Sequence, residues 1–390
     1  MELTVRFSPR APLIRGVVTM VVAAGALALP FAACRAPTHP DGQPELLVVT
    51  GLDGGRAQLI DGRSLRLVRS LGPELALPGY SALSVDSSLL LLSGATTARD
   101  TFLVVALDTK TFNTAWRISV SALQGSGGIR IHLPTVVGLS PDRTRLYVWP
   151  ADSAGIPGVA AVSITTRTIT GFLALRVFAT RIMVFRGRGS MPEGTLAVTA
   201  TRHPSMTVKP NAVFLLTEDL AVIDSILVPT GQLGAYDAVL SPDETTLNVL
   251  APPYLTALDV TTRSVIGTTP SMAASYLWLG VDSLIYEVDG GQGADAQTPG
   301  FLVEHHNTLR ARRALSLLDA GVSGRLPIAR AVAVNRTGTT AYVLTGSLPM
   351  ATAAEKAAVA RYDLSSGNHS RTLSLDQHGT AFRIFMLPER

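Results

Sequence analysis

Histidine and cysteine, the side chains that most often bind metals or transfer protons, are few in this sequence. The histidines are His39, His132, His203, His305, His306, His369 and His378. No pair of them has the spacing of a metal-ligand set. The adjacent His305 and His306 would point to opposite faces of a strand, although on a turn the two could bind a metal together. The segment 289–295 (DGGQGAD) could hold calcium, but an acidic, glycine-rich hairpin tip is the favoured interpretation.

Other catalytic signatures are missing. Cys34 is the only cysteine, so no disulfide can close within the chain and thiolate metal sites and haem attachment are excluded. The sequence contains neither a glycine-rich phosphate loop of known spacing nor a Gly-x-Ser-x-Gly elbow. We therefore predict no metal and no cofactor, and we assign no catalytic residue.

Several aspartates recur at regular places, and their positions argue for turns. Asp142 and Asp243 each follow Ser-Pro, in which proline presets the turn and the serine and aspartate side chains cap nearby amides. Asp108 and Asp259 each precede a threonine by three residues in a second type of turn. Because such residues recur once per repeat, we interpret them as turn formers and not as catalytic carboxylates.

These turns belong to a degenerate repeat of about 50 residues, a length typical of propeller blades. The clearest copies span residues 136–170 and 237–267, and weaker ones begin at residues 81 and 331. Each copy has four short apolar runs separated by polar turns, which predicts a four-stranded antiparallel sheet. A divergent copy, with strands predicted in 179–185, 195–200 and 212–228, surrounds an insertion rich in glycine and proline.

Counting the divergent copy gives seven units, the first of which starts at Leu46. That unit begins with a segment that aligns with the second strand of the others, and the chain ends with an orphan first strand at residues 379–388. We therefore predict an all-β ring of seven four-stranded blades, closed by the C-terminal strand, which removes the free edges of the sheets. This β-propeller is expected to span residues 45–390.

The Ser-Pro-Asp turn, the Leu-Tyr-Val strand of residues 146–148 and the V-x-D-x-x-T hairpin together resemble the YVTN family of β-propeller repeats. Residues 108–116 (DTKTFNTAW) are similar to the tryptophan-bearing repeat of quinoprotein propellers. The resemblance implies a seven-bladed propeller, whose architecture would be similar to that of WD40 proteins. It implies little about activity, because relatives include lactonases, amine dehydrogenase subunits and many surface proteins.

A lactonase-like site would need histidine, arginine and acidic residues that converge at the central channel. Arg130, His132 and Arg181 are predicted near the starts of innermost strands and are the candidate channel-facing residues. They carry the alternative that the protein is an enzyme of lactonase or quinoprotein type. A propeller that binds a small ligand in its channel is a further alternative.

The N-terminal region resembles a bacterial lipoprotein signal. Arg6, Arg10 and Arg15 precede an uncharged run of residues 16–33, and Cys34 follows directly. We predict a signal peptide over 1–33, lipid attachment at Cys34 and a flexible tether over 34–44. An ordinary signal peptide or an uncleaved anchor remains open. Every version exports the body to the periplasm or cell surface, and Arg35 favours the outer membrane over the inner.

Composition narrows the class of partner. Removing Arg6, Arg10, Arg15 and Glu2 with the signal leaves 30 basic and 28 acidic residues, so the exported body is almost neutral. No basic run suggests a nucleic-acid partner. Charged residues are only 16% of the chain, against about 25% in ordinary soluble domains. Three units also contain long connections, where binding sites often lie. The low fraction of charged residues and these connections together favour a membrane-tethered scaffold that docks another protein in an envelope complex. We expect this scaffold to be monomeric and not an enzyme.

Overall fold

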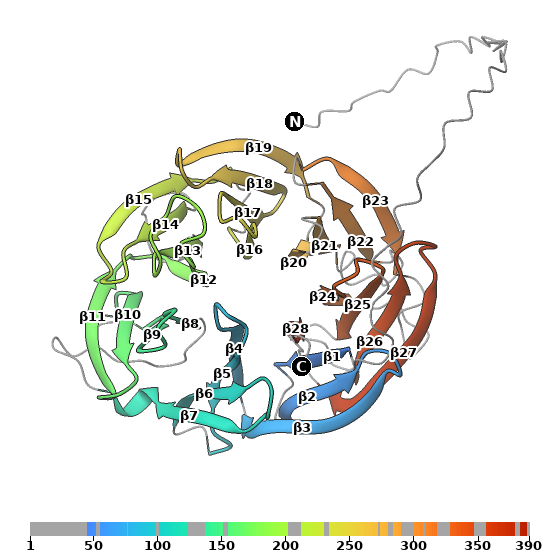
Figure 1. Cartoon of the computed structure of the whole chain (residues 1–390), viewed down its shortest axis with the longest axis horizontal. Coiled ribbons are helices and arrows are strands. Elements are labelled where there is room, and N and C mark those ends of the chain that lie inside the picture. Colours follow the sequence, from blue (N-terminus) through green and yellow to red (C-terminus); the bar gives the residue numbers. More distant parts are fainter. Residues whose placement is uncertain are drawn as a thin grey trace, which may run out of the picture. The chain divides into compact units, whose positions relative to one another are not determined.

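The computed structural model shows the chain after residue 44 as a ring of antiparallel sheets (Figure 1). It describes residues 45–51, 55–75, 77–98, 101–123, 137–150, 155–201, 212–229, 234–271, 274–279, 284–289, 300–306, 309–317, 328–346, 356–378 and 383–387. The predicted signal peptide and tether lie outside these residues. No helix of the described part is long and apolar enough to cross a membrane.

Seven sheets of four strands form the ring, and we number them as blades in chain order. Blade 1 contains β28 (Arg383–Met386), β1 (Leu46–Thr50), β2 (Gly55–Asp61) and β3 (Arg66–Leu75). Blade 2 contains β4 (Leu77–Leu83), β5 (Leu89–Ala95), β6 (Phe102–Asp108) and β7 (Thr114–Ser119), followed by a 3-10 turn, η1 (Val120–Ala122). Blade 3 contains β8 (Val137–Leu139), β9 (Arg145–Val148), β10 (Gly158–Ser163) and β11 (Thr168–Ala174).

The remaining blades follow the same order. Blade 4 contains β12 (Phe178–Val184), β13 (Leu196–Thr201), β14 (Ala212–Leu216) and β15 (Val222–Leu227). Blade 5 contains β16 (Asp237–Leu240), β17 (Thr246–Ala251), β18 (Tyr254–Asp259) and β19 (Ser264–Pro270). Blade 6 contains β20 (Ala274–Leu279), β21 (Ile285–Asp289), β22 (Phe301–His305) and β23 (Ala311–Ser316). Blade 7 contains β24 (Ile328–Val334), β25 (Thr340–Gly346), β26 (Lys356–Asp363) and β27 (His369–His378).

Blade 1 joins the two ends of the ring, as the sequence predicts. The C-terminal strand β28 pairs antiparallel with β1, with Val48 opposite Phe385 and Leu47 opposite Met386. The amide of Leu387 extends this ladder by donating to the carbonyl of Leu46, at 2.9 Å. The expected divergent unit is also confirmed as blade 4, because the strands predicted in 179–185, 195–200 and 212–228 correspond to β12, to β13 and to β14 with β15.

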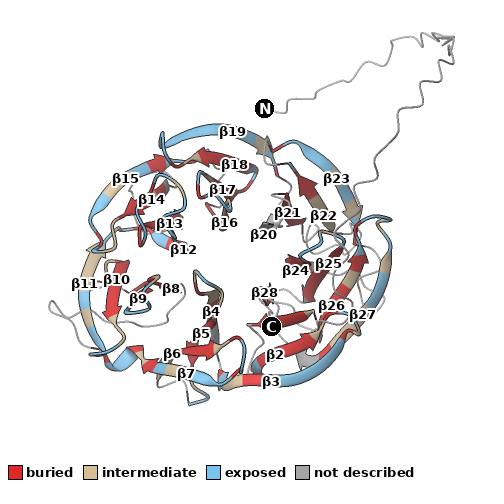
Figure 2. Cartoon of the chain, in the orientation of Figure 1, coloured by how far each residue is buried: buried red, intermediate tan, exposed pale blue. Residues whose placement is uncertain are grey.

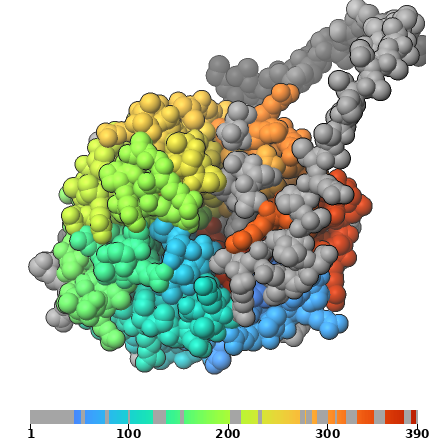
Figure 3. All heavy atoms as spheres, viewed as in Figure 1, coloured from blue at the N-terminus to red at the C-terminus, as the bar shows by residue number. Residues whose placement is uncertain are grey.

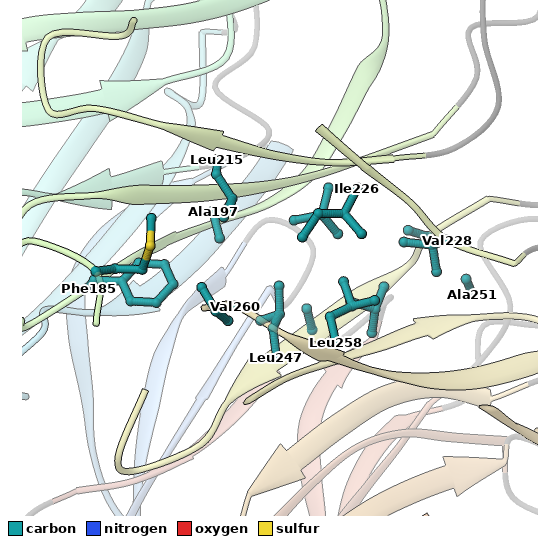
Figure 4. Close-up of a cluster of buried hydrophobic side chains, with 14 residues drawn as sticks. Phe185, Ala197, Leu215, Ile226, Val228, Leu247, Ala251, Leu258 and Val260 are labelled. Atoms are coloured by element: carbon teal, nitrogen blue, oxygen red, sulfur yellow. The ribbon is translucent and has the colours of Figure 1, made fainter. Parts of the chain in front are cut away.

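The hydrophobic core is divided among the interfaces between blades. Successive residues of a strand point to opposite faces of its sheet, so a fully buried strand contacts both neighbouring blades. In β1, Leu47 and Val49 pack with residues of blade 7, while Leu46 and Val48 pack with blade 2. Each of the seven interfaces holds such a cluster. Figure 4 shows the cluster between blades 4 and 5, where Leu215 and Ile226 lie across from Leu247 and Leu258.

Burial decreases from the middle of each blade to its outer strand. Strand β5 is buried along its whole length, whereas β19 is mainly exposed. Figure 2 shows the same gradient around the ring, with exposed residues gathered on β3, β15 and β19. In the space-filling view the blades pack against one another in sequence order (Figure 3). The apolar residues of this chain are therefore concentrated in the inner strands of the blades, and the exposed residues lie mainly on the outer strands.

The recurring aspartates form turns, as predicted. In blade 3 the hydroxyl of Ser140 donates to the carboxylate of Asp142 at 2.5 Å and accepts the amide of Arg145 at 2.9 Å. Ser241 and Asp243 repeat this arrangement in blade 5. These hydrogen bonds lower the pKa of Asp142 and of Asp243, with the bond from serine as the main cause in each. The carboxylates are therefore engaged in the turns.

Candidate functional site

The innermost strand of every blade contributes to a central cavity of about 420 Å³. Figure 1 shows these strands, β4, β8, β12, β16, β20, β24 and β28, around the middle of the ring. Because all seven run in the same direction through their blades, the cavity has one end near the strand starts and another near the strand ends. A volume of this size is typical of small-molecule sites.

A buried aspartate gathers two arginines near the strand starts. The carboxylate of Asp237, the first residue of β16, is completely buried and forms ion pairs with Arg181 of β12 and Arg383 of β28. The Arg383 guanidinium binds both carboxylate oxygens, at 3.0 and 3.1 Å. The amide of Leu277 in β20 donates to the same carboxylate at 3.1 Å.

Arg383 extends this cluster to another blade. Its guanidinium donates to the hydroxyl of Tyr80 in β4 at 2.8 Å and lies 5.0 Å from the centre of the tyrosine ring. The cluster of Tyr80, Arg181, Asp237, Leu277 and Arg383, called here the channel cluster, connects blades 1, 2, 4, 5 and 6. It therefore ties together, across the channel, blades that are not neighbours in the ring.

The electrostatics of the channel cluster keep Asp237 ionised. Burial alone would raise the pKa of Asp237, but the guanidiniums of Arg181 and Arg383 outweigh burial and hold this pKa below its ordinary value. A carboxylate so held is a poor general base, because its affinity for protons is lower than that of an ordinary aspartate. The channel cluster is thus suited to holding the ring together.

The opposite end of the cavity contains two more arginines. Arg186 and Arg188 line this end and lie on the connection between β12 and β13. The buried carboxylate of Glu244 accepts the backbone amide of Arg186 at 2.7 Å and that of Arg188 at 2.9 Å. Partial burial and the charge of Arg188 lower the pKa of Arg186, and they outweigh the charges of Glu244 and Asp86, which raise it. Two like charges are therefore placed side by side at the cavity wall.

The conformation of Glu244 follows from its place in a Ser-Pro-Asp turn. The fourth residue of this turn has a positive φ, 60° for Glu244 and 62° for Arg143 at the equivalent position in blade 3. In blade 3 this residue reaches Asp86 of blade 2, whereas in blade 5 it reaches the connection in blade 4. The same backbone position thus joins neighbouring blades in both places, with opposite charges.

The structure places only part of the predicted site. Arg181 lines the cavity, but its guanidinium is paired with Asp237. Arg130, His132 and Cys34 lie outside the described residues. Asp237 and Arg383 form most of the hydrogen bonds and ion pairs of the channel cluster, and neither residue was predicted from the sequence as part of a site. The sequence does contain a signal for Asp237. This acidic residue occupies the position that the apolar Val136 holds in the blade 3 copy of the repeat.

The adjacent histidines do not form a shared metal site in the described structure. His305 is buried, and its Nε2 lies 2.9 Å from Glu287, which also accepts the hydroxyl of Ser271. His306 is exposed. Among the described residues, no group of three histidine, cysteine or acidic side chains could hold a metal. The segment 290–295 of the calcium alternative lies outside these residues.

The fold defines the class: the protein is a seven-bladed β-propeller. No family model and no curated protein sequence matches it. The periplasmic gluconolactonase of Pseudomonas aeruginosa is similar in structure, with 13% identity, a TM-score of 0.59, and coverage of 88% of this chain and 99% of that one. A functionally unknown protein of Desulfotomaculum acetoxidans has 11% identity, a TM-score of 0.58, and coverage of 88% and 98%.

A third similar structure is a dihydro-heme d1 dehydrogenase in complex with its ligand, DHE. It has 12% identity, a TM-score of 0.53, and coverage of 90% of this chain and 77% of that one. Identities this low indicate a common fold and not a common activity. The function must therefore be argued from the cavity itself.

Proposed function

We propose that this protein is a non-catalytic binding propeller, exported and held at a membrane, whose central cavity takes up a small molecule. The observation that carries the proposal is the cavity of about 420 Å³, which all seven innermost strands line. Its two ends are fixed by buried ion pairs and by Glu244, so the walls are already formed before a ligand arrives. Sequence alone favoured a scaffold for another protein, and the cavity moves small-molecule binding to first place.

The state of the carboxylates supports binding over catalysis. Asp237 is bound by two guanidiniums, and Glu244 by two backbone amides. Neither group is available to take a proton from a substrate or from water. We expect no hydrolysis of gluconolactone above the uncatalysed rate in a direct assay. Measurable turnover would favour the enzyme alternative.

A substitution that fills the cavity tests the proposal. Ala82 of β4 lines the cavity and is partly buried. We expect Ala82→Trp to abolish the rise in melting temperature caused by a ligand from the set glucose, gluconate and glucose 6-phosphate. At a ligand concentration of 100 times Kd, that ligand stabilises the wild type by about 2.7 kcal/mol.

The matched control is Ala115→Trp, which adds the same bulk at an exposed position of the outer strand β7. Circular dichroism must show that both variants are folded. The proposal is wrong if none of the three compounds stabilises the wild type, or if Ala82→Trp responds as strongly as Ala115→Trp does.

Docking of a protein partner is a second candidate, and exposed apolar side chains favour it. Val222 and Leu227 on β15 are 53% and 59% exposed, and Val265 and Ile266 on β19 are 41% and 57% exposed. These outer strands belong to the neighbouring blades 4 and 5, and each offers an unpaired edge that a partner strand could extend. Such a surface fits a subunit of an envelope complex.

One preparation tests both the tether and the partner. The full chain, tagged after Arg390, is expected in the membrane fraction because of the predicted lipid on Cys34. Recovery in the soluble fraction would contradict the tether.

Capture of the tagged protein from solubilised membranes, repeated with Ile266→Asp, then tests docking. A partner that copurifies with the wild type and not with the variant supports this candidate, whereas recovery of the protein alone at every detergent strength contradicts it.

A further inference from the structure

We propose that Arg186 and Arg188 form an anion-binding subsite, which takes the carboxylate or phosphate group of the small molecule held in the cavity. This inference rests on the proposed function and names the chemical class of the ligand. Both residues line the cavity at the end where the innermost strands finish. The end with the channel cluster would then hold the uncharged part of the ligand.

The charges of Glu244 and Asp86 only partly offset the unfavourable surroundings of the Arg186 guanidinium. Within the described structure, neither guanidinium at this end of the cavity forms an ion pair with a carboxylate, in contrast to Arg181 and Arg383 at the other end. Both side chains are exposed to solvent at the cavity. Their proximity is unfavourable in the free protein, since the charge of Arg188 opposes that of Arg186. An anion between them would remove this repulsion.

The nearest carboxylate, that of Glu244, is used to fix the backbone. Its two oxygens accept the amides of Arg186 and Arg188, at 2.7 and 2.9 Å. Glu244 is only 3% exposed, and it therefore acts as a positioning residue that leaves both guanidiniums for another acceptor. The charge of Glu244 raises the pKa of Arg186, but among the described residues its carboxylate forms no ion pair with either guanidinium.

Two glycines hold the connection close to blade 5. Gly187 has a φ of 74°, which few other residues adopt without strain. A Cβ at Gly189 would lie 2.9 Å from the carbonyl oxygens of both Asp243 and Glu244, so only glycine fits there without a shift. The hydroxyl of Ser190 also lies 2.6 Å from that of Thr261 in the same blade. The arginines are thus carried by a fixed segment, as a preformed site requires.

The chemistry of the site indicates the ligand. Arginine binds carboxylate and phosphate oxygens through paired N–H donors. Ser87 lines the same end, and a serine hydroxyl can serve as an additional donor. The cavity volume of about 420 Å³ fits a molecule of monosaccharide size. We therefore infer a small organic acid or organic phosphate.

Titration of the full chain with glucose, gluconate and glucose 6-phosphate at equal ionic strength tests the inference. These compounds share a six-carbon polyol and differ in having no charge, a carboxylate or a phosphate. We expect calorimetry to show binding of at least one anion and at least about tenfold weaker binding of glucose, because charge-assisted hydrogen bonds are the strong ones. The preferred anion distinguishes carboxylate from phosphate.

The double variant Arg186→Gln/Arg188→Gln is expected to raise the Kd for the anion at least about tenfold. Because it also removes like-charge repulsion, its melting temperature without ligand is expected to be no lower than that of the wild type. The control Arg117→Gln removes an exposed arginine from the outer strand β7 and is expected to leave binding unchanged.

The outcomes separate this inference from the proposed function. If glucose binds as well as the anions, or if the double variant keeps wild-type affinity while Ala82→Trp loses it, the cavity binds a ligand and the anion subsite is wrong. If none of the compounds binds the wild type, both proposals are wrong. Equal weakening by Arg117→Gln would also contradict the subsite, because it would indicate only a general effect of net charge.

Discussion

A chain that ends at His378 is expected to lose the folded ring. This deletion removes β28, and with it three buried side chains, Ile384, Phe385 and Leu387, and the guanidinium of Arg383. Burying each of the three apolar side chains stabilises a protein by about 1.5–3 kcal/mol. The sum is comparable to the free energy of unfolding of a typical domain, which is about 5–15 kcal/mol. Strand β1 would also present an unpaired apolar edge, which promotes aggregation.

Gel filtration and circular dichroism measure this loss. A synthetic peptide of residues 379–390, added during refolding, is expected to restore a monomeric β-rich protein, because β28 pairs with β1 through backbone hydrogen bonds. The control peptide carries Ile384→Asp, which places a charge in the cluster between blades 7 and 1. A truncated chain that stays folded and monomeric without peptide would show that β28 does not close the ring.

Substitution of Asp237 by asparagine is expected to destabilise the protein by about 3–5 kcal/mol, since two guanidiniums lose the carboxylate that compensates their burial. Arg383 is the more affected, with a side chain only 8% exposed, whereas water partly compensates Arg181 at 24%. Urea denaturation at pH 7 measures the change. The matched control is Asp219→Asn, which breaks the ion pair of an 82% exposed side chain with Arg145. It is expected to cost less than about 1 kcal/mol.

The stability conferred by Asp237 depends on pH in a defined direction. Its pKa in the folded protein lies below the value of about 3.9 found in unfolded chains. The contribution is therefore complete above about pH 4 and is lost as the pH falls through the lower, folded value. We expect the difference in unfolding free energy between wild type and Asp237→Asn to shrink only below about pH 4. A difference that stays constant down to pH 2 would contradict a lowered pKa.

Local patterns were sufficient to predict the architecture. The turns at Ser140 and Ser241 repeat the same three-residue chemistry, and the alternation of apolar and polar runs between them allows only short antiparallel strands. Closure was predictable because Leu46 begins a segment that aligns with a second strand and not with a first. Each of these signals lies within a few consecutive residues, and each was confirmed in the structure.

The site was less accessible, because its contacts join residues that are far apart in the chain. Arg383 meets Asp237 across 146 positions and Tyr80 across 303. No local period relates these residues, and an arginine near a chain terminus gives no indication that it is buried. Glu244 shows the same limit, since its turn was predicted but the blade that its carboxylate contacts was not. Arg181 was placed on an innermost strand, while its partner was missed.

The position of β28 also constrains how this protein is made. The ribosome makes β1, β2 and β3 before the other six blades and β28 after them, so blade 1 stays incomplete while those blades are made. Until residue 383 has been made, Asp237 can form an ion pair with Arg181 but not with Arg383, and the ring of blades is not closed. A prematurely terminated product would carry both defects at once, which makes it an easy target for proteases. Blade 1 and the channel cluster therefore cannot be completed before residues 383–387 have been made.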